Sequence, residues 1–363
     1  MGVEQNDFRD MFSVYLSGPP QTQHVFCVSP AARVAHTGLA GEEWLKAFPL
    51  QAFQYGDGGN VRISFTAGSM PVFTENTGNI VHQFFVCQRT VTAYLVRIKV
   101  LAPGQKKAKT GRIWTYVRDD RNVGSSSPPA VWFAYSPNRQ GKHPEQHLRP
   151  FRGILQADAF TGYDRLFSAE REGGALTEVA CWAHARRKIH DVYISSKSAT
   201  AEEALKRISE LYAIEDEIRG LPESERLAAR QQRSKALLTS LHEWMVEKNG
   251  TLSKKSRLGE AFSYVLNQWD ALCYYSDDGL AEVDNNTAKR ALRAVCLGKK
   301  NYVFFGSDHG GERGALLYGL IGTCRLNGID LEAYLSHILS VLPEWPSNRV
   351  GELLPWNVVL TNK

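Results

Sequence analysis

Three carboxylates occupy positions in this sequence that are typical of catalytic acids. Asp158 ends the short apolar run GILQA, and Glu282 and Asp284 precede NNTAKRALR, which has the pattern of a helix start. Oxygen ligands with basic residues nearby are what phosphoryl transfer with two Mg²⁺ ions requires, because carboxylates bind hard cations and Lys or Arg side chains hold phosphates. Spacing alone leaves another interpretation open, in which Asp158 caps a turn and the other two acids stabilise a helix dipole.

Basic residues gather at three places in the second part of the chain. They are Lys106, Lys107 and Lys109, then Arg186, Arg187 and Lys188, and finally Arg290, Arg293, Lys299 and Lys300. Residues 1–96 carry five Lys or Arg and seven Asp or Glu, whereas residues 97–363 carry 38 and 31, so a net +7 in the second part underlies the formal charge of +5. The clusters are candidate contacts to nucleic-acid phosphates, although charged runs are also typical of a solvated surface.

Common nucleotide-binding, hydrolase and metalloprotease motifs are absent from the sequence, which contains no G-x-x-x-x-G-K-[ST], G-x-S-x-G or H-E-x-x-H. His143 and His147 in HPEQH have no third ligand nearby in the sequence. Cys181 and His184 have C-x-x-H spacing without a partner pair, so we expect a buried Cys beside a hydrogen-bonded His. The six cysteines form no C-x-x-C pair, which favours a reducing compartment over a disulfide framework.

Length and composition indicate a globular protein. A chain of 363 residues with 43% hydrophobic and 22% charged residues can bury a core, and its length suggests about two domains. No apolar run approaches the ~18 residues of a membrane span, and the first residues lack the order of a signal peptide. We therefore expect a cytoplasmic protein without a membrane partner.

Strand patterns precede a long helical region. GRIWTYVRDD, AVWFAYSPN and GILQAD predict three neighbouring strands, the first two as a hairpin, and VRISFTAG and IVHQFFVC are weaker candidates. Apolar stripes predict two helices between residues 200 and 250 and another near 258–272, with Pro222 in the first turn of the second and Gly250 at its end. Later helices are expected to be capped by Asn286 and Asp330, the last one ending before Pro343.

A series of motifs makes the sequence resemble a known family. In order they are WTYVRDD, YSPNRQGKHPEQHL, FRGILQADAFTGYDRL, EVACWAHARRKI, LYAIEDEIRG, AEVDNNTAKRALR, LGKKNYVFFGSDHGGERGA, LNGIDLEAYLSHIL and NRVGELLPWN. From about Val100 to Asn357 the chain thereby resembles the bacterial insertion sequence 66 family of transposases, within the Asp-Asp-Glu superfamily. This resemblance implies DNA transposition, in which the ends of an insertion sequence are cut and joined to a target.

The resemblance also implies a fold and a set of partners. It implies an α/β, ribonuclease-H-like mixed sheet flanked by helices over residues 97–325, with a helical insertion at about 198–275 and a helical C-terminal element over 326–363. Two Mg²⁺ (or Mn²⁺) ions would be held by three acids, of which Asp158 matches the second and Glu282 or Asp284 could supply another. Double-stranded DNA, further copies of the chain and accessory proteins of the same element are the implied partners.

The sequence departs from the family where two catalytic acids are expected. The first should lie just before VLAPGQKKAKTGR, yet no Asp or Glu occurs between Asn76 and Arg118, and Lys289 stands where the family has a glutamate. Residues 1–96 do not resemble the family's front part, which suggests a frameshift or a junction near Val96. Three hypotheses follow: a degenerate but active transposase, an inactive DNA-binding remnant, or another nuclease on the same fold.

Overall fold

The computed structural model describes residues 89–101, 104 and 107–360, together with the backbone of four short strands closer to the N-terminus. These strands are β1 (Phe12–Leu16), β2 (Val25–Val28), β3 (Gln54–Gly56) and β4 (Asn60–Ile63), and they form an antiparallel sheet in the order β2-β1-β4-β3. Strand β4 includes the start of VRISFTAG, whereas IVHQFFVC and Lys106 lie outside the described residues.

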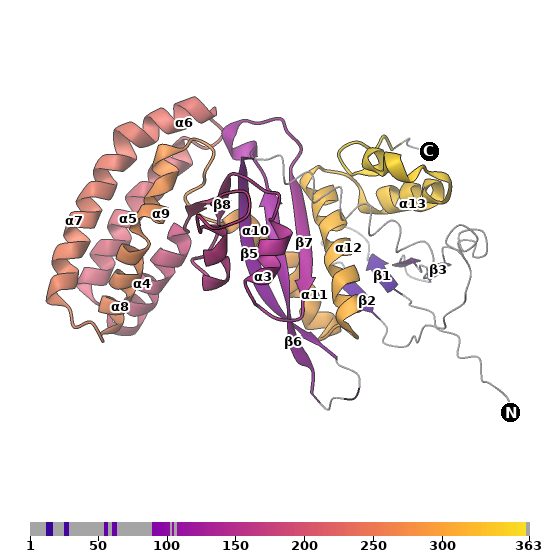
Figure 1. Ribbon diagram of the computed structural model, residues 1–363, viewed down its shortest axis with the longest axis horizontal. Helices are drawn as coiled ribbons and strands as arrows, with labels where there is room; N and C mark the ends of the chain where they lie inside the picture. Colours follow the sequence, from indigo (N-terminus) through magenta and orange to yellow (C-terminus); the bar gives the residue numbers. More distant parts are fainter. Residues whose placement is uncertain are drawn as a thin grey trace.

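A five-stranded mixed sheet forms the centre of the protein (Figure 1). Its strands are β5 (Thr90–Val100), β6 (Lys109–Arg118), β7 (Ala130–Ser136), β8 (Ile154–Gln156) and β9 (Thr177–Val179), in the order β7-β6-β5-β8-β9. The predicted β6–β7 hairpin is confirmed, and β5 pairs antiparallel with β6. The prediction that β8 neighbours this hairpin was wrong, because β8 pairs in parallel with β5 and β9 instead.

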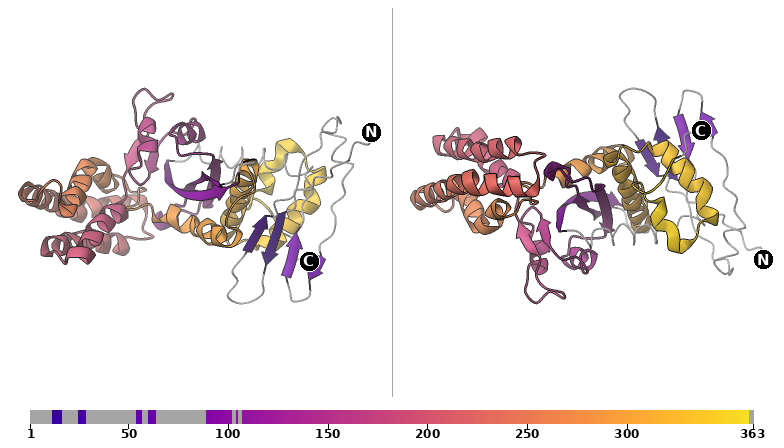
Figure 2. Two further views of the ribbon diagram at one scale, coloured as in Figure 1. Left: turned by 90° about the horizontal axis from the view of Figure 1, so that it is seen from below. Right: turned by 90° about the horizontal axis from the view of Figure 1, so that it is seen from above.

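Helices cover both faces of this sheet, as the alternation of its side chains requires. Trp114 and Tyr116 of β6 belong to a core that includes Leu148 and Phe151, next to α3 (Lys142–His147). Side chains such as Ile113, on the opposite face, pack against α10 (Asn286–Ala291), α11 (Arg293–Tyr302) and α12 (Asp308–Leu326). The views from below and above show the sheet between two groups of helices (Figure 2).

One of these groups is a helical unit that follows β9. It consists of α4 (Trp182–Ser196), α5 (Ala199–Glu217), α6 (Glu223–Ala229), α7 (Lys235–Thr251), α8 (Arg257–Asn267) and α9 (Trp269–Cys273). The predicted apolar stripes form its core, for example at Ile208 and Phe262. A π-helical stretch, Arg230–Ser234, joins α6 to α7. Pro222 is the N-cap of α6, whereas Gly250 lies inside α7 rather than at its end.

Of the two helix caps predicted from the sequence, Asn286 and Asp330, the structure confirms one. Asp330 caps α13 (Leu331–Val341), since its Oδ1 accepts a hydrogen bond of 2.8 Å from the backbone N–H of Ala333. Asn286 is not a cap: it is the first residue of α10, and its backbone N–H donates to Asp284 Oδ1 over 2.9 Å. In the part of the chain that the structure describes, no helix is long and apolar enough to cross a bilayer.

Thr323 of α12 is hydrogen-bonded to the edge strand β7. Its hydroxyl oxygen lies 3.2 Å from both the backbone N and the backbone O of Val131, accepting from one and donating to the other. Gly322 allows this close approach, because a Cβ there would lie 2.5 Å from Cγ1 of Val131. The buried hydroxyl therefore replaces the neighbouring strand that β7 lacks on this side.

Replacing Thr323 by Val should lower the free energy of unfolding by about 1–3 kcal/mol, because two buried backbone groups of Val131 lose their partner. Val has nearly the volume of Thr and keeps its methyl group, so the loss of stability measures the contribution of the hydroxyl group. Urea denaturation of both proteins measures it, and an unchanged midpoint would show that the bonds do not stabilise the fold.

Candidate active site and nucleic-acid interface

Asp158 lies two residues beyond the end of β8, in a partly buried position. Its Oδ2 is 3.7 Å from Nε2 of His184, too long for a hydrogen bond, and its buried Oδ1 has no hydrogen-bond partner among the described residues. Burial raises the pKa of this carboxyl from 3.8 to about 6, against a smaller opposing effect of the Lys289 cation. Asp158 is therefore a poorly solvated carboxylate at neutral pH.

His184 does not form an ion pair with this carboxylate at neutral pH. Burial lowers the pKa of His184 to about 4, and the nearby charges of Lys289, Arg187 and Lys188 lower it further in the same direction. The imidazole, carried by α4, is consequently neutral, and its buried Nδ1 also has no hydrogen-bond partner in the described part of the chain.

Lys289 is the cation of this site. Its Nζ donates to Sγ of Cys181 over 3.5 Å and to Oδ1 of Asn286 over 3.4 Å. Cys181 is buried as expected, and burial raises the pKa of its thiol despite the Lys289 charge, so it remains a thiol at neutral pH. The ammonium group thus lies among neutral donors and acceptors and acts on the charge of Asp158 at longer range.

Tyr94 brings the central strand β5 into the site. Its ring centre lies 5.9 Å from that of His184, and Nζ of Lys289 is 5.8 Å from it. Burial raises the pKa of the Tyr94 hydroxyl, and the charge of Asp158 raises it further. The β5 side chain beside Asp158 is therefore a neutral phenol.

Glu282 and Asp284 are engaged by neighbours other than Asp158. Oε1 of Glu282 lies 2.9 Å from Nη2 of the buried Arg226, and burial raises the pKa of this carboxyl while Arg226 lowers it. Oδ2 of Asp284 accepts hydrogen bonds from the hydroxyl of Tyr212 (3.0 Å) and from Nδ2 of Asn286 (2.7 Å). The structure thus joins both acids to the helical unit, and Asp284 also to the start of α10.

Arg230, which the sequence analysis did not identify, fixes the loop before these acids. It is fully buried, and its Nε and Nη2 donate to the two carboxylate oxygens of Glu215 over 2.8 and 2.5 Å. Its Nη1 donates to the backbone oxygens of Tyr275, Asp278 and Ala281. The signal in the sequence was the pair of Arg residues four positions apart, Arg226 and Arg230, within an otherwise amphipathic helix.

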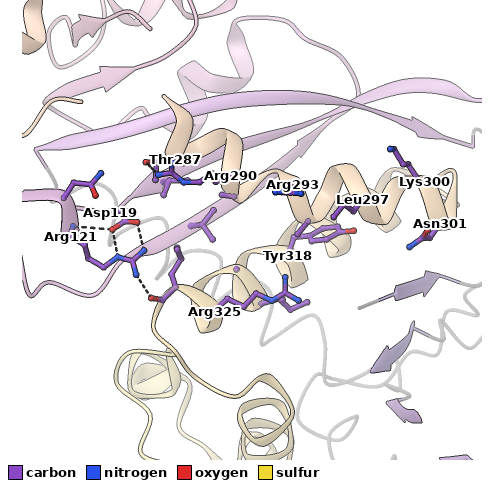
Figure 3. A pocket seen from close by; sticks show the side chains of 18 residues that line it. Asp119, Arg121, Thr287, Arg290, Arg293, Leu297, Lys300, Asn301, Tyr318 and Arg325 are labelled. Atoms are coloured by element: carbon purple, nitrogen blue, oxygen red, sulfur yellow. Dashed lines mark hydrogen bonds and ion pairs between the residues drawn. The ribbon is translucent and has the colours of Figure 1, made fainter. Parts of the chain in front are cut away.

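A cleft of about 880 Å³ lies on the other side of α10 (Figure 3). Three predicted phosphate contacts line it, Arg290, Arg293 and Lys300, whereas Lys299 points elsewhere and donates to the backbone oxygen of Arg97 over 3.3 Å. Arg121 and Arg325, which were not predicted, also line the cleft. Little in the sequence indicated these two residues, because each is an isolated arginine outside any cluster of basic residues.

A second predicted basic cluster lies on α4, where Arg186, Arg187 and Lys188 are exposed, whereas Lys109 of the third cluster forms an ion pair of 2.5 Å with Asp308. Lys188 Nζ is 4.4 Å from the ring centre of Tyr264. The histidines of HPEQH contact other side chains: Nε2 of His143 lies 2.8 Å from Oδ1 of Asn138, and Nδ1 of His147 lies 3.0 Å from the hydroxyl of Tyr116.

Comparison with known proteins identifies the family of this chain. Residues 88–313 match the IS66 family of transposases, and residues 319–356 match the IS66 C-terminal element. The match covers more than half of the chain, which therefore belongs to this family. The resemblance inferred from the motifs is confirmed.

Curated relatives are similar to this chain over different shares of its length. The uncharacterized protein y4hP of Sinorhizobium fredii is 41% identical over 262 residues, which are 69% of this chain and 48% of y4hP. The uncharacterized protein y4qI of the same organism is 37% identical over 264 residues, covering 72% of this chain and 49% of y4qI. Uncharacterized protein YuaK of Escherichia coli is 43% identical over 58 residues, 16% of this chain and 62% of YuaK. The chain thus spans about half the length of y4hP and y4qI.

The family implies a divalent metal, so the donors around Asp158 can be compared with what Mg²⁺ requires. Two Mg²⁺ ions need several oxygen ligands, most of them carboxylates. Among the described residues, no group of three His, Cys, Asp or Glu side chains is placed to hold a metal. Asp158 instead faces a neutral imidazole and the charge of Lys289. The described donors do not fit a two-metal centre.

Asp158→Asn should stabilise the protein above pH 6. Because the folded-state pKa of about 6 lies above the ordinary value of 3.8, the folded state binds more protons in between, and stability falls as the pH rises through this window. The variant escapes this loss, which is on the order of 3 kcal/mol.

Thermal melts of wild type and Asp158→Asn in metal-free buffer at pH 4 and pH 8 measure the difference. The two proteins should melt alike at pH 4, and the variant should melt higher at pH 8. A variant that is destabilised equally at both values would contradict the burial of an unpaired carboxylate.

Proposed function

We propose that this chain takes part in DNA transposition as a DNA-binding protein that does not cut strands on its own. Membership of the IS66 transposase family supports the role in transposition. The proposal that the chain does not cut strands rests on the composition of the Asp158 site, where a lysine and a neutral histidine stand in place of further carboxylates. A site of this kind lacks the ligands for two cations.

The same proposal includes a ribonuclease-H-like catalytic domain with a helical insertion. The mixed order β7-β6-β5-β8-β9, with a carboxylate just beyond β8, supports it, as does the helical unit α4 to α9 between β9 and α10. In the family the first acid belongs to the strand before VLAPG, which is β5 here. Tyr94 is the β5 side chain in contact with this site, and a phenol whose pKa is raised cannot replace a carboxylate at neutral pH.

DNA binding rests on cations that are free to meet phosphates. The exposed Arg186, Arg187 and Lys188 of α4 and the residues lining the cleft supply them. Binding of this kind is sequence-independent in large part and weakens steeply as salt rises. The proposed partners are double-stranded DNA of element ends and target, further copies of the chain and accessory proteins of the same element, in the bacterial cytoplasm.

A second candidate function is a Mg²⁺- or Mn²⁺-dependent transposase. One observation favours it: Asp158 lies just beyond the end of β8, and one of its carboxylate oxygens has no hydrogen-bond partner among the described residues. Further ligands would have to come from Glu282, after separation from Arg226, from Asp284, or from outside the described residues. The two functions differ in metal binding by the chain itself.

Titration calorimetry with Mn²⁺ tests the proposal, with Lys289 as the decisive position. Wild type should bind no Mn²⁺ that depends on Asp158. Lys289→Glu removes the cation and adds a second carboxylate near Asp158, so it should create a site with a dissociation constant on the order of 10⁻⁴–10⁻³ M.

Lys289→Met is the matched control, since it removes the charge without adding an oxygen ligand and should show no such heat. Wild-type binding that Asp158→Asn abolishes would contradict the proposal and support the metal-dependent enzyme. A Lys289→Glu variant that binds no Mn²⁺ would show that Lys289 is not what excludes the metal.

A further inference from the structure

We propose that the cleft between α10–α11 and α12 holds a single DNA strand, with phosphates along its basic rim and sugar and base against its floor. This inference rests on the proposed DNA function and names the form of DNA that one site accepts. Figure 3 shows the cleft with the labelled side chains around it. Four features of the cleft lead to this assignment.

The first feature is a row of cations on one wall. Arg290, Arg293 and Lys300 are exposed and recur, with Leu297, at intervals of three or four residues, which places them along one side of α10–α11. At 1.5 Å per residue, Arg290 and Lys300 are separated by roughly 15 Å along the helix axis. A row of this length can contact successive phosphates of one strand.

The second feature is the lack of compensating carboxylates. Arg325 extends the positive charge to the opposite wall, and within the described residues no carboxylate forms an ion pair with Arg290, Arg293, Lys300 or Arg325. Asp119, the acid that lines the cleft, is already bound by Arg121, with Nε to Oδ1 and Nη2 to Oδ2 both 2.7 Å. Four unpaired cations around one cleft favour an anionic ligand, because mutual repulsion is relieved when it binds.

The third feature is an apolar floor of limited width. Val117, Val131 and Ile321 are buried beneath the basic side chains, and Leu297 is 52% exposed at the wall. About 880 Å³ lies in the range that encloses a small ligand, so a double helix can only bridge the rim. A single strand can enter and cover apolar atoms with its sugars and bases, as strands do in other positively charged grooves.

The fourth feature is the position of the cleft relative to Asp158. Lys289 points from α10 towards Cys181 and the Asp158 site, whereas the next residue, Arg290, lines the cleft. The two sites therefore lie on different sides of one short helix. Because Lys289 and Arg290 are neighbours in α10, a strand separated from a duplex near Asp158 would leave that site beside the cleft, which favours DNA over an unrelated anion.

Fluorescence anisotropy with three labelled oligonucleotides tests the inference: a single strand, a blunt duplex and a duplex with an unpaired end. The double variant Arg293→Gln, Arg325→Gln removes one cation from each wall. It should weaken binding of the single strand and of the unpaired end by about tenfold, and that of the blunt duplex, which meets only the rim, by no more than about threefold. The matched control, Lys254→Gln with Lys255→Gln, removes two exposed charges at the far end of the helical unit and should change none of the three.

The outcomes distinguish a failure of the single-strand assignment from a failure of the proposed DNA-binding function. If wild type binds duplex DNA but the cleft variant binds all three probes like wild type, or weakens for all three equally, the single-strand assignment is wrong and the proposed function survives. If wild type binds none of the probes at low salt, the proposed function fails and the inference with it. Competition with polyglutamate adds a further check: a cleft that binds this acidic peptide and not the single strand is a protein-docking site instead.

Discussion

The buried guanidinium of Arg230 is the interaction on which the geometry of the candidate site depends. It joins α5, through Glu215, to the loop that ends the helical unit, through three backbone oxygens of residues 275–281. Removing one partner of such a buried pair costs about 3–5 kcal/mol, because the remaining charge has no solvent. The loop cannot move while Arg230 stays in place, so the residues that follow it are held at a fixed distance from the sheet.

Further hydrogen bonds connect the helical unit and the segment that follows it to the sheet. Nη1 of Arg226 donates to the backbone oxygen of Asn122 beyond β6 over 2.7 Å, while Nδ2 of Asn285 donates to the backbone oxygen of Ala93 in β5 over 3.1 Å. The side chain of Gln156, the last residue of β8, also donates to the backbone oxygen of Glu282. Backbone positions around Asp158 are thus held by groups that do not depend on the side chains at 94 and 289. A scaffold of this kind can keep its shape while the residue types that would bind metal change.

Much of the local structure could be predicted from the sequence, and the reasons are local. The β6–β7 hairpin follows from β-branched and aromatic residues around a turn, and the Asp330 cap follows from an acid at the start of an apolar helix pattern. The pairing of β8 with β5 could not be predicted, because it depends on contacts between segments some sixty residues apart. Arg226 and Arg230 resembled a solvated helix face, since a sequence does not show which charges find buried partners.

The candidate site was likewise predicted from the sequence only in part. The position of Asp158 beyond a buried strand was foreseen, as was the gathering of Arg290, Arg293 and Lys300, although their shared cleft with Arg325 required the fold. The contacts of Glu282 with Arg226 and of Asp284 with Tyr212 were missed, because both depend on where the helical unit docks. The measurement that tests the central claim most directly is a strand-cleavage assay on labelled DNA carrying the ends of the encoding element, in Mg²⁺ and in Mn²⁺, resolved on a denaturing gel. The account predicts DNA that is bound but uncut; metal-dependent nicks that disappear in Asp158→Asn would contradict it.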